Sequence, residues 1–221
     1  MQVKHLKELR LGDLVAKLPI VQGGMGVGVS LSGLASAVAQ EGGIGVIAAA
    51  GMGMLEPDGF SNYVEASKRR MRMEIRKARA KTDGILGVNI MVALSNFADM
   101  VTTSLEEGID VIFSGAGLPL NLPQFLKEKH KTKLVPIVSS GRAAVLICKR
   151  WLDRYDYLPD AFVVEGPKAG GHLGFKPEQL DQPEFALEML VPEVIEAIRP
   201  ISEKNQKHIP VIAAGGIFTG A

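Results

Sequence analysis

The chain has few of the residues that would mark a secreted, nucleic-acid-binding or membrane-spanning protein. Its 221 residues include one cysteine, Cys148, so no intrachain disulfide can form and a reducing compartment is expected. Aromatic residues make up only 5% and the net charge is +1, which argues against nucleic-acid readout. The longest apolar stretch, Ile44 to Met54, is too short and too glycine-rich to span a bilayer. Met1 to Arg10 is charged and shows no signal peptide, so the protein is predicted to be cytoplasmic, with no membrane partner.

Short apolar segments alternate with helical patterns along the chain. The predicted strands are 19–22, 45–49, 86–91, 111–114, 134–138, 161–165 and 210–214. The predicted helices are 31–40, 63–81, 96–107, 123–129, 142–154 and 191–205. This alternation predicts an α/β protein with a parallel sheet and helices outside it. Seven evenly spaced strands favour a TIM (β/α)8-type barrel that lacks its eighth βα unit over an open doubly wound sheet.

The domain prediction is one barrel domain over residues 1–221, incomplete at its C-terminal end. The sequence leaves open whether the chain is a fragment, the product of a truncated gene, or a chain that something else completes. An open barrel would leave its first and seventh strands as exposed edges, which invites aggregation or pairing. A homo-oligomer is therefore an open alternative.

Two features follow early strands and suit a ligand. Gln22-Gly-Gly-Met-Gly26 follows the first predicted strand, and its glycines let the backbone pass close to a flat molecule, although an ordinary tight turn has the same composition. Asn89 stands at the carboxyl end of the third predicted strand. An amide in an apolar strand needs partners. Asn89 would therefore hold the edge of a heterocycle or satisfy a neighbouring loop.

The most specific local feature is the loop Glu165-Gly-Pro-Lys-Ala-Gly-Gly-His-Leu-Gly174, which follows the sixth predicted strand. A barrel places such a loop at its active face. Imidazole exchanges protons near neutral pH, so His172 is predicted to be a catalytic acid or base. No second His, Cys or carboxylate stands at ligand spacing near His172, so no metal is predicted. No nucleophile elbow is present, which disfavours a hydrolase.

The last predicted strand runs into Gly215-Gly216, whose backbone N–H groups a ligand can approach closely. In TIM barrels the loops after the seventh and eighth strands form the usual phosphate site. A ring-binding turn, a strand-end amide, one histidine and a phosphate turn together suggest a phosphorylated planar cofactor. FMN fits, because its chemistry resides in the ring and the protein positions it and supplies a proton path.

The predicted helix 63–81 carries a strong basic bias. It could present a solvated outer face, dock an acidic partner such as a carrier protein, or contact nucleic acid, and the lack of interleaved aromatic residues disfavours the last. The basic residues are Lys68, Arg69, Arg70, Arg72, Arg76, Lys77, Arg79 and Lys81.

A set of motifs occurs in a recognisable order: Gln22-Gly-Gly-Met25, Gly87-Val-Asn-Ile-Met91, Ser114-Gly-Ala-Gly117, the loop 165–174, and Ile209-Pro-Val-Ile-Ala-Ala-Gly-Gly-Ile217. Over nearly the whole chain this set resembles the nitronate monooxygenase family, formerly called 2-nitropropane dioxygenases, which includes FMN-dependent enoyl-acyl-carrier-protein reductases. The resemblance implies a TIM barrel with FMN at the strand carboxyl ends and His172 as the active-site acid or base. The cofactor-binding positions it implies are Gly24, Met25, Asn89, Glu165, Gly170, Gly171, Gly215 and Gly216.

The chain departs from the family at two places. Lys168 stands where many members have Glu, and the family continues past the paired glycines into an eighth strand that this sequence does not contain. The resemblance implies a small-molecule substrate, either a nitronate oxidised with O2 or an enoyl thioester reduced with NAD(P)H. Gly26-Val27 follows Gly24-Met25 here, whereas the reductases tend to carry a tryptophan close by, and this difference favours the nitronate. The alternative from another class of protein is a truncated, non-catalytic barrel that no longer holds flavin.

Overall fold

The computed structural model describes residues 6–172 and 174–217. This part of the chain forms two compact units. The first unit runs to Phe113 and includes Phe125–Lys133, and the second consists of Ser114–Gln124 and the residues from Leu134 onward.

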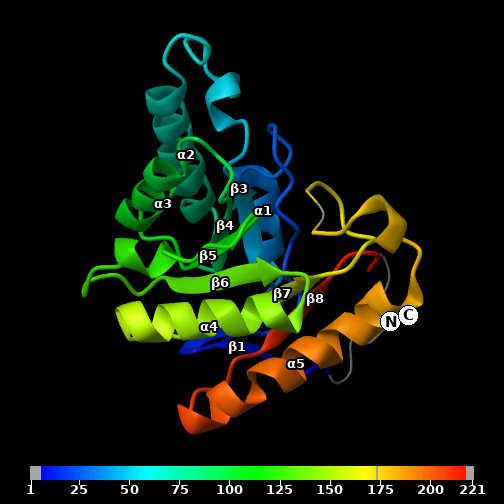
Figure 1. Cartoon of the computed structure of the whole chain (residues 1–221). Helices are drawn as coiled ribbons and strands as arrows, with labels where there is room; N and C mark the ends of the chain where they lie inside the picture. The colour runs from blue at the N-terminus through cyan, green and yellow to red at the C-terminus, as the bar shows by residue number, and fades with distance from the viewer. Residues whose placement is uncertain (1–5, 173, 218–221) are drawn as a thin grey trace. The chain divides into compact units, whose positions relative to one another are not determined.

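The first unit begins with an antiparallel hairpin and continues with parallel strands and helices. Its elements are β1 (Leu9–Leu11), β2 (Leu14–Ala16), α1 (Ser32–Gln40), β3 (Gly45–Ala48), the 3-10 helix η1 (Met52–Leu55), α2 (Tyr63–Arg79), β4 (Leu86–Met91), α3 (Phe97–Glu106) and β5 (Val111–Gly115), which ends in the second unit. β3 and β4 are parallel, with Gly45 opposite Leu86 and Ala48 opposite Asn89. α1 and α3 pack against these strands, and α2 packs against α1 and α3 (Figure 1).

The core of the first unit explains its sequence pattern. β3 is buried along its whole length, as a strand covered on both faces requires, and this gives the continuous apolar run Val46-Ile47-Ala48. Met71 and Ile75 of α2 lie four residues apart and are both buried, since that spacing places them on one helical face.

The second unit contains three parallel strands in the order β6-β7-β8. The elements that lie wholly or largely in it are η2 (Leu122–Phe125), β6 (Lys133–Val138), α4 (Gly141–Tyr155), β7 (Phe162–Glu165), η3 (Pro177–Gln179), η4 (Pro183–Phe185), α5 (Leu187–Lys204) and β8 (Val211–Ala214). Glu165 lies opposite Ala214 in the β7–β8 pair. α4 and α5 pack side by side (Figure 1).

Ser140 caps the start of α4, because its hydroxyl accepts the N–H of Ala143 at 3.3 Å. Cys148 and Trp151 are fully buried on its inner face, as expected for a cysteine that acts as a small apolar side chain. The indole N–H of Trp151 donates to the carbonyl of Pro119 at 2.9 Å, so the buried ring leaves no polar atom unsatisfied.

Two predicted elements are wrong. Residues 19–22 form no strand. Their one pairing is an isolated β-bridge between Val21 and Ile44. Beyond this bridge the side chain of Gln22, and not the backbone, bonds to the neighbouring strand, because its amide donates to the carbonyl of Val46 at 2.8 Å. The ladder of backbone hydrogen bonds ends there.

The predicted helix 123–129 is a single 3-10 turn, η2. The ring Nδ1 of His130 accepts the N–H of Lys127 at 3.0 Å, which gives this donor a partner outside a helix. A stretch this short gains too few backbone bonds to offset the cost of helix nucleation.

The other predicted strands and helices are confirmed to within a few residues, and β4 has the predicted bounds. The β1–β2 hairpin was not predicted. In residues 6–172 and 174–217 no helix has both the length and the apolar character needed to cross a membrane.

Candidate functional site

In the first unit, the glycine turn and the strand-end amide lie against each other. A Cβ atom on Gly24 would stand 2.4 Å from the Cβ and 2.8 Å from the Cγ of Asn89, so no larger residue fits there without a shift. Asn89 is half-buried at the carboxyl end of β4. Its side-chain amide makes no hydrogen bond to any residue that the structure describes, which favours a free amide over one that satisfies a loop.

The turn that carries Gly24 and Met25 is held by two side chains. The buried hydroxyl of Ser30 accepts the N–H of Met25 at 3.0 Å, and the amide of Gln22 donates to the same hydroxyl at 3.0 Å. The N–H of Ser30 returns a bond to the carbonyl of Met25 at 2.9 Å. Met25 is 46% exposed above this frame. Ser30 was missed from the sequence, because its position five residues beyond Met25 gives no motif.

In the second unit, the histidine loop is anchored to the carboxyl ends of β6 and β8. The N–H of Gly166 donates to the carbonyl of Ala214 at 3.0 Å. A Cβ on Gly174 would lie 2.6 Å from the hydroxyl of Ser139, the residue that follows β6. Gly170, Gly171 and His172 are exposed between these two anchors.

The paired glycines lie against the start of the same loop. Gly215 and Gly216 have φ values of +107° and +77°, which favour glycine. A Cβ on Gly215 would lie 2.7 Å from the backbone nitrogen of Ala169. β7 and β8 are parallel, so His172 and the paired glycines follow strands that end at the same side of the sheet.

Glu165 is half-buried at the end of β7, and burial raises the pKa of its carboxyl group. Among the residues described, no side chain or backbone group donates a hydrogen bond to this carboxylate, and no cation lies within ion-pair distance. The group is therefore easier to protonate than a solvated glutamate.

The second unit has a cavity of about 330 Å³ beside the glycine turn. Gly166 and Lys168 of the histidine loop line it together with Gly215 and Gly216. The exposed carboxylates of Asp181 and Glu188 stand on its wall. The cavity is a place where backbone N–H groups and a lysine are accessible together.

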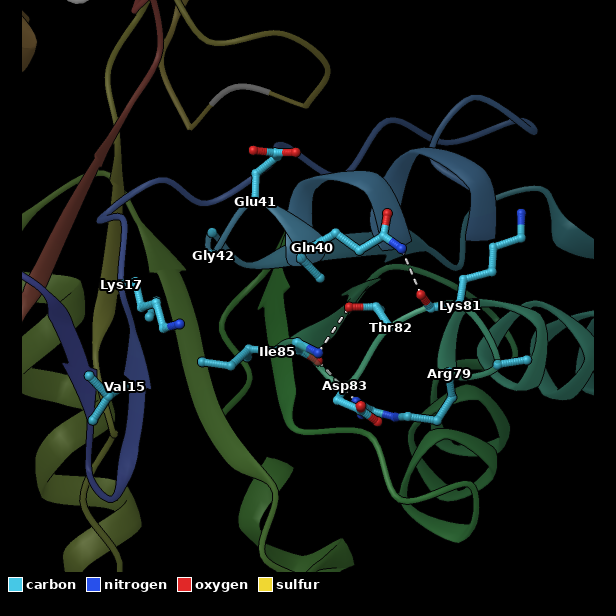
Figure 2. A pocket seen from close by; sticks show the side chains of 15 residues that line it. Val15, Lys17, Gln40, Glu41, Gly42, Arg79, Lys81, Thr82, Asp83 and Ile85 are labelled. Carbon is cyan, nitrogen blue, oxygen red and sulfur yellow. Dashed lines mark hydrogen bonds between the residues drawn. The ribbon is translucent and has the colours of Figure 1, made fainter. Parts of the chain in front are cut away.

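A larger cavity of about 720 Å³ lies in the first unit at the amino ends of β3 and β4 (Figure 2). None of the predicted site residues lines it. Its polar rim is used in local structure: Gln40 donates to the carbonyl of Lys81 at 2.7 Å, and Arg79 donates to the carbonyl of Gly84 at 3.0 Å (Figure 2). Active sites of TIM barrels form at the other, carboxyl end of the strands.

The basic residues of α2 are largely neutralised within the first unit. Arg76 makes a two-bond pair with Glu107, with both distances 2.7 Å. Arg70 binds the buried Glu74 at 2.8 Å, and Arg79 binds Asp110 at 2.7 Å. Further pairs join Lys68 to Glu65, Arg69 to Asp58 and Arg72 to Glu106. This pairing leaves little free positive charge for the acidic partner considered from the sequence.

The fold class follows from these observations and from a solved relative. Parallel strands follow each other in chain order with helices between them, as in a TIM (β/α)8-type barrel, whereas a doubly wound sheet reverses its order. The structure of FabK from Thermotoga maritima matches with a TM-score of 0.66 and 31% identity, over 91% of this chain and 52% of that one. The fold class is that of a TIM barrel, as predicted.

The chain belongs to the nitronate monooxygenase family, whose profile matches residues 8–221. It is 30% identical over 202 residues to the (3aS,4S,5R,7aS)-5-hydroxy-7a-methyl-1-oxo-octahydro-1H-indene-4-carboxyl-CoA dehydrogenase of Mycobacterium tuberculosis, with 91% of this chain and 46% of that protein covered. It is 25% identical over 236 residues to a probable nitronate monooxygenase of Staphylococcus saprophyticus, with 95% and 61% covered. The chain thus spans about half the length of the first of these relatives. The family is one of oxidoreductases.

Proposed function

We propose that the protein is an FMN-dependent oxidoreductase that oxidises alkyl nitronates with O2. The observation that carries the proposal is the placement of the His172 loop and the Gly215-Gly216 turn at the carboxyl ends of two paired strands, β7 and β8. This pairs a group able to move a proton with a turn suited to a phosphate.

The residues present fit a flavin phosphate. Within residues 6–172 and 174–217, no backbone hydrogen bond uses the N–H groups of Gly215 or Gly216, and neither residue has a Cβ to block them. In the proposal these N–H groups hold the phosphate, and Gly170, Gly171 and Glu165 face the ring or its chain. Gly24, Met25 and Asn89 of the first unit are also proposed to contact the flavin. Asn89 would do so through its free amide and Met25 through its exposed thioether. When bound, FMN supplies the electron acceptor and the reactivity toward O2.

His172 has the proposed role of proton carrier. Its exposed ring is reachable by a substrate, and its loop is fixed at both ends while the ring itself makes no hydrogen bond to a described residue. The imidazole would take the proton from the carbon next to the nitro group of a neutral nitroalkane, which gives the nitronate that is then oxidised. Half-buried Glu165 begins the loop and is easier to protonate than a solvated carboxylate, because burial raises its pKa.

The second candidate is reduction of an enoyl thioester, with NAD(P)H as the electron donor. Its support is the 30% identity to the dehydrogenase of a carboxyl-CoA compound, against 25% to the probable nitronate monooxygenase. The first candidate keeps priority because the basic residues of α2, which would recognise an acidic carrier, are paired with carboxylates of their own unit.

One preparation separates the candidates. The purified chain is examined for flavin absorption bands, with and without added FMN. Flavin bands and O2 uptake with an alkyl nitronate support the first candidate. Rapid anaerobic bleaching by NAD(P)H without nitronate turnover supports the second. A chain that shows no flavin bands even with FMN added is a barrel without flavin chemistry, and both candidates fall.

A further inference from the structure

The side chain of Lys168 lies against Gly216, the second of the paired glycines. A Cβ on Gly216 would stand 3.1 Å from the Cβ and 3.2 Å from the Cδ of Lys168. The hydrocarbon stem of the lysine therefore occupies the space that a side chain at 216 would need. Position 216 accommodates the lysine because it is a glycine with a φ of +77°.

The positive charge of Lys168 is not neutralised by an ion pair. No carboxylate oxygen among the residues described comes within ion-pair distance of its ammonium group, although the carboxylates of Asp181 and Glu188 line the same cavity. Lys168 itself is exposed. Its ammonium group is thus available to a ligand that enters the cavity of about 330 Å³.

The lysine and the turn offer complementary donors at one place. Gly215 and Gly216 present N–H groups that no backbone bond within the described residues uses, and Lys168 adds a mobile point charge. A phosphate monoester near neutral pH carries close to two negative charges and three acceptor oxygens. Backbone N–H groups and a lysine together are a common recognition set for such a group.

We propose that Lys168 is a phosphate-binding residue that makes this site select FMN over riboflavin. The inference rests on the proposed flavin site and adds to it a specificity residue of this chain. The ammonium group binds the phosphate held at Gly215-Gly216, and it contributes nothing to binding of the ring, which FMN and riboflavin share.

The test compares FMN and riboflavin binding to the flavin-free full chain, measured by quenching of flavin fluorescence. Lys168→Ala is the test variant, and Lys176→Ala is the matched control, because Lys176 is an exposed lysine further along the same segment that does not line the cavity. We expect Lys168→Ala to raise the Kd for FMN at least tenfold and to leave the Kd for riboflavin within twofold, since hydrogen bonds to charged groups are among the stronger ones. Lys176→Ala should change neither value.

Added salt should weaken FMN binding in the unmodified protein more than in Lys168→Ala, because the variant lacks one of the screened charges. Circular dichroism checks that Lys168→Ala is folded. If Lys168→Ala does not fold, Lys168→Met takes its place, because methionine keeps most of the hydrocarbon stem of the lysine. An equal change in both Kd values, or no change in the Kd for FMN, overturns the inference while the flavin site stands. If the unmodified chain binds neither flavin, the proposed function fails first and the inference falls with it.

Discussion

Gly24 and Asn89 lie so close that a Cβ on Gly24 would stand 2.4 Å from the Cβ of Asn89. The two residues are far apart in the sequence, and each was predicted to lie near a flat ligand. Their contact means that the backbone of the glycine turn covers one side of a strand-end amide. Only the absence of a side chain at position 24 permits this approach.

Gly24→Ala is expected to lower the free energy of unfolding by about 1–3 kcal/mol, because the added methyl group forces the turn or Asn89 to move. Gly23→Ala is the matched control, since a Cβ on Gly23 would meet no atom within 4 Å. That control should be neutral or slightly stabilising, because alanine restricts the unfolded chain. Urea unfolding of both variants measures the difference. Equal losses at the two positions would contradict the contact.

Glu74 joins α1 to α2 through a buried carboxylate. It accepts the N–H of Ser32 at 2.9 Å and pairs with Arg70 at 2.8 Å. Burial alone would raise the pKa of Glu74, but the hydrogen bonds at Ser32 and the charge of Arg70 outweigh it, so the pKa is lowered. A lowered pKa means that the carboxylate stabilises the fold at neutral pH and that this contribution is lost as the pH falls through the folded-state value.

Glu74→Ala should therefore cost about 3–5 kcal/mol at pH 7, as expected when one partner of a buried pair is removed. Glu65→Ala on the same helix breaks the exposed pair with Lys68 and should cost much less, because solvent screens that pair. Chemical unfolding of the two variants at pH 7 makes the comparison. A loss at Glu74 no larger than the loss at Glu65 would show that the buried pair is not formed.

Glu165 should show the opposite dependence on pH. Burial raises the pKa of its carboxyl group, so the folded state holds the proton more tightly than the unfolded state does. The resulting stability is present at low pH and is lost as the pH rises through the folded-state value. Glu165→Gln, which cannot ionise, should thus melt at a higher temperature than the unmodified flavin-free protein at pH 8.

The same two proteins should converge near pH 4, where the carboxyl group is protonated. Glu188→Gln, at an exposed position in the same unit, serves as the control and should show no such divergence. A lower melting temperature for Glu165→Gln at pH 8 would mean that the carboxylate has a stabilising partner. Thermal melts across this pH range provide the measurement.

Cys148 should be chemically inert in the folded protein. Burial raises the pKa of its thiol to about 12, so almost no thiolate exists at pH 8, and the side chain is inaccessible. A disulfide reagent such as Ellman's reagent should find no reactive thiol in the native chain and one thiol per chain in guanidinium chloride. Rapid reaction of the native protein would place the thiol near the surface.

The parts of the fold that were predicted correctly are those encoded by local patterns. β4 has the predicted bounds Leu86–Met91 because it is largely buried and apolar, with Asn89 as its one polar residue. The segment 19–22 has a similar composition, but the side chain of Gln22 occupies the hydrogen-bonding position that a strand would need. A local sequence pattern does not reveal that a side chain makes this hydrogen bond in place of the backbone.

The site was predictable to the extent that chain order decides it. Loops after neighbouring parallel strands meet at one end of a sheet, so His172 and Gly215 could be expected at the same end. The extent to which the charge of α2 is neutralised could not be predicted, because several of its acidic partners are distant in sequence. Arg76, for example, pairs with Glu107, which lies 31 residues away.

The central claim is that the imidazole of His172 moves a proton at a flavin site that other residues build. It is tested most directly by measuring flavin content and turnover of His172→Ala in the same preparation. The account predicts an unchanged FMN-to-protein ratio and a loss of turnover of about 10²- to 10⁴-fold with a neutral nitroalkane, the magnitude typical of a lost general acid or base. Unchanged turnover in a variant that keeps its flavin would contradict the claim.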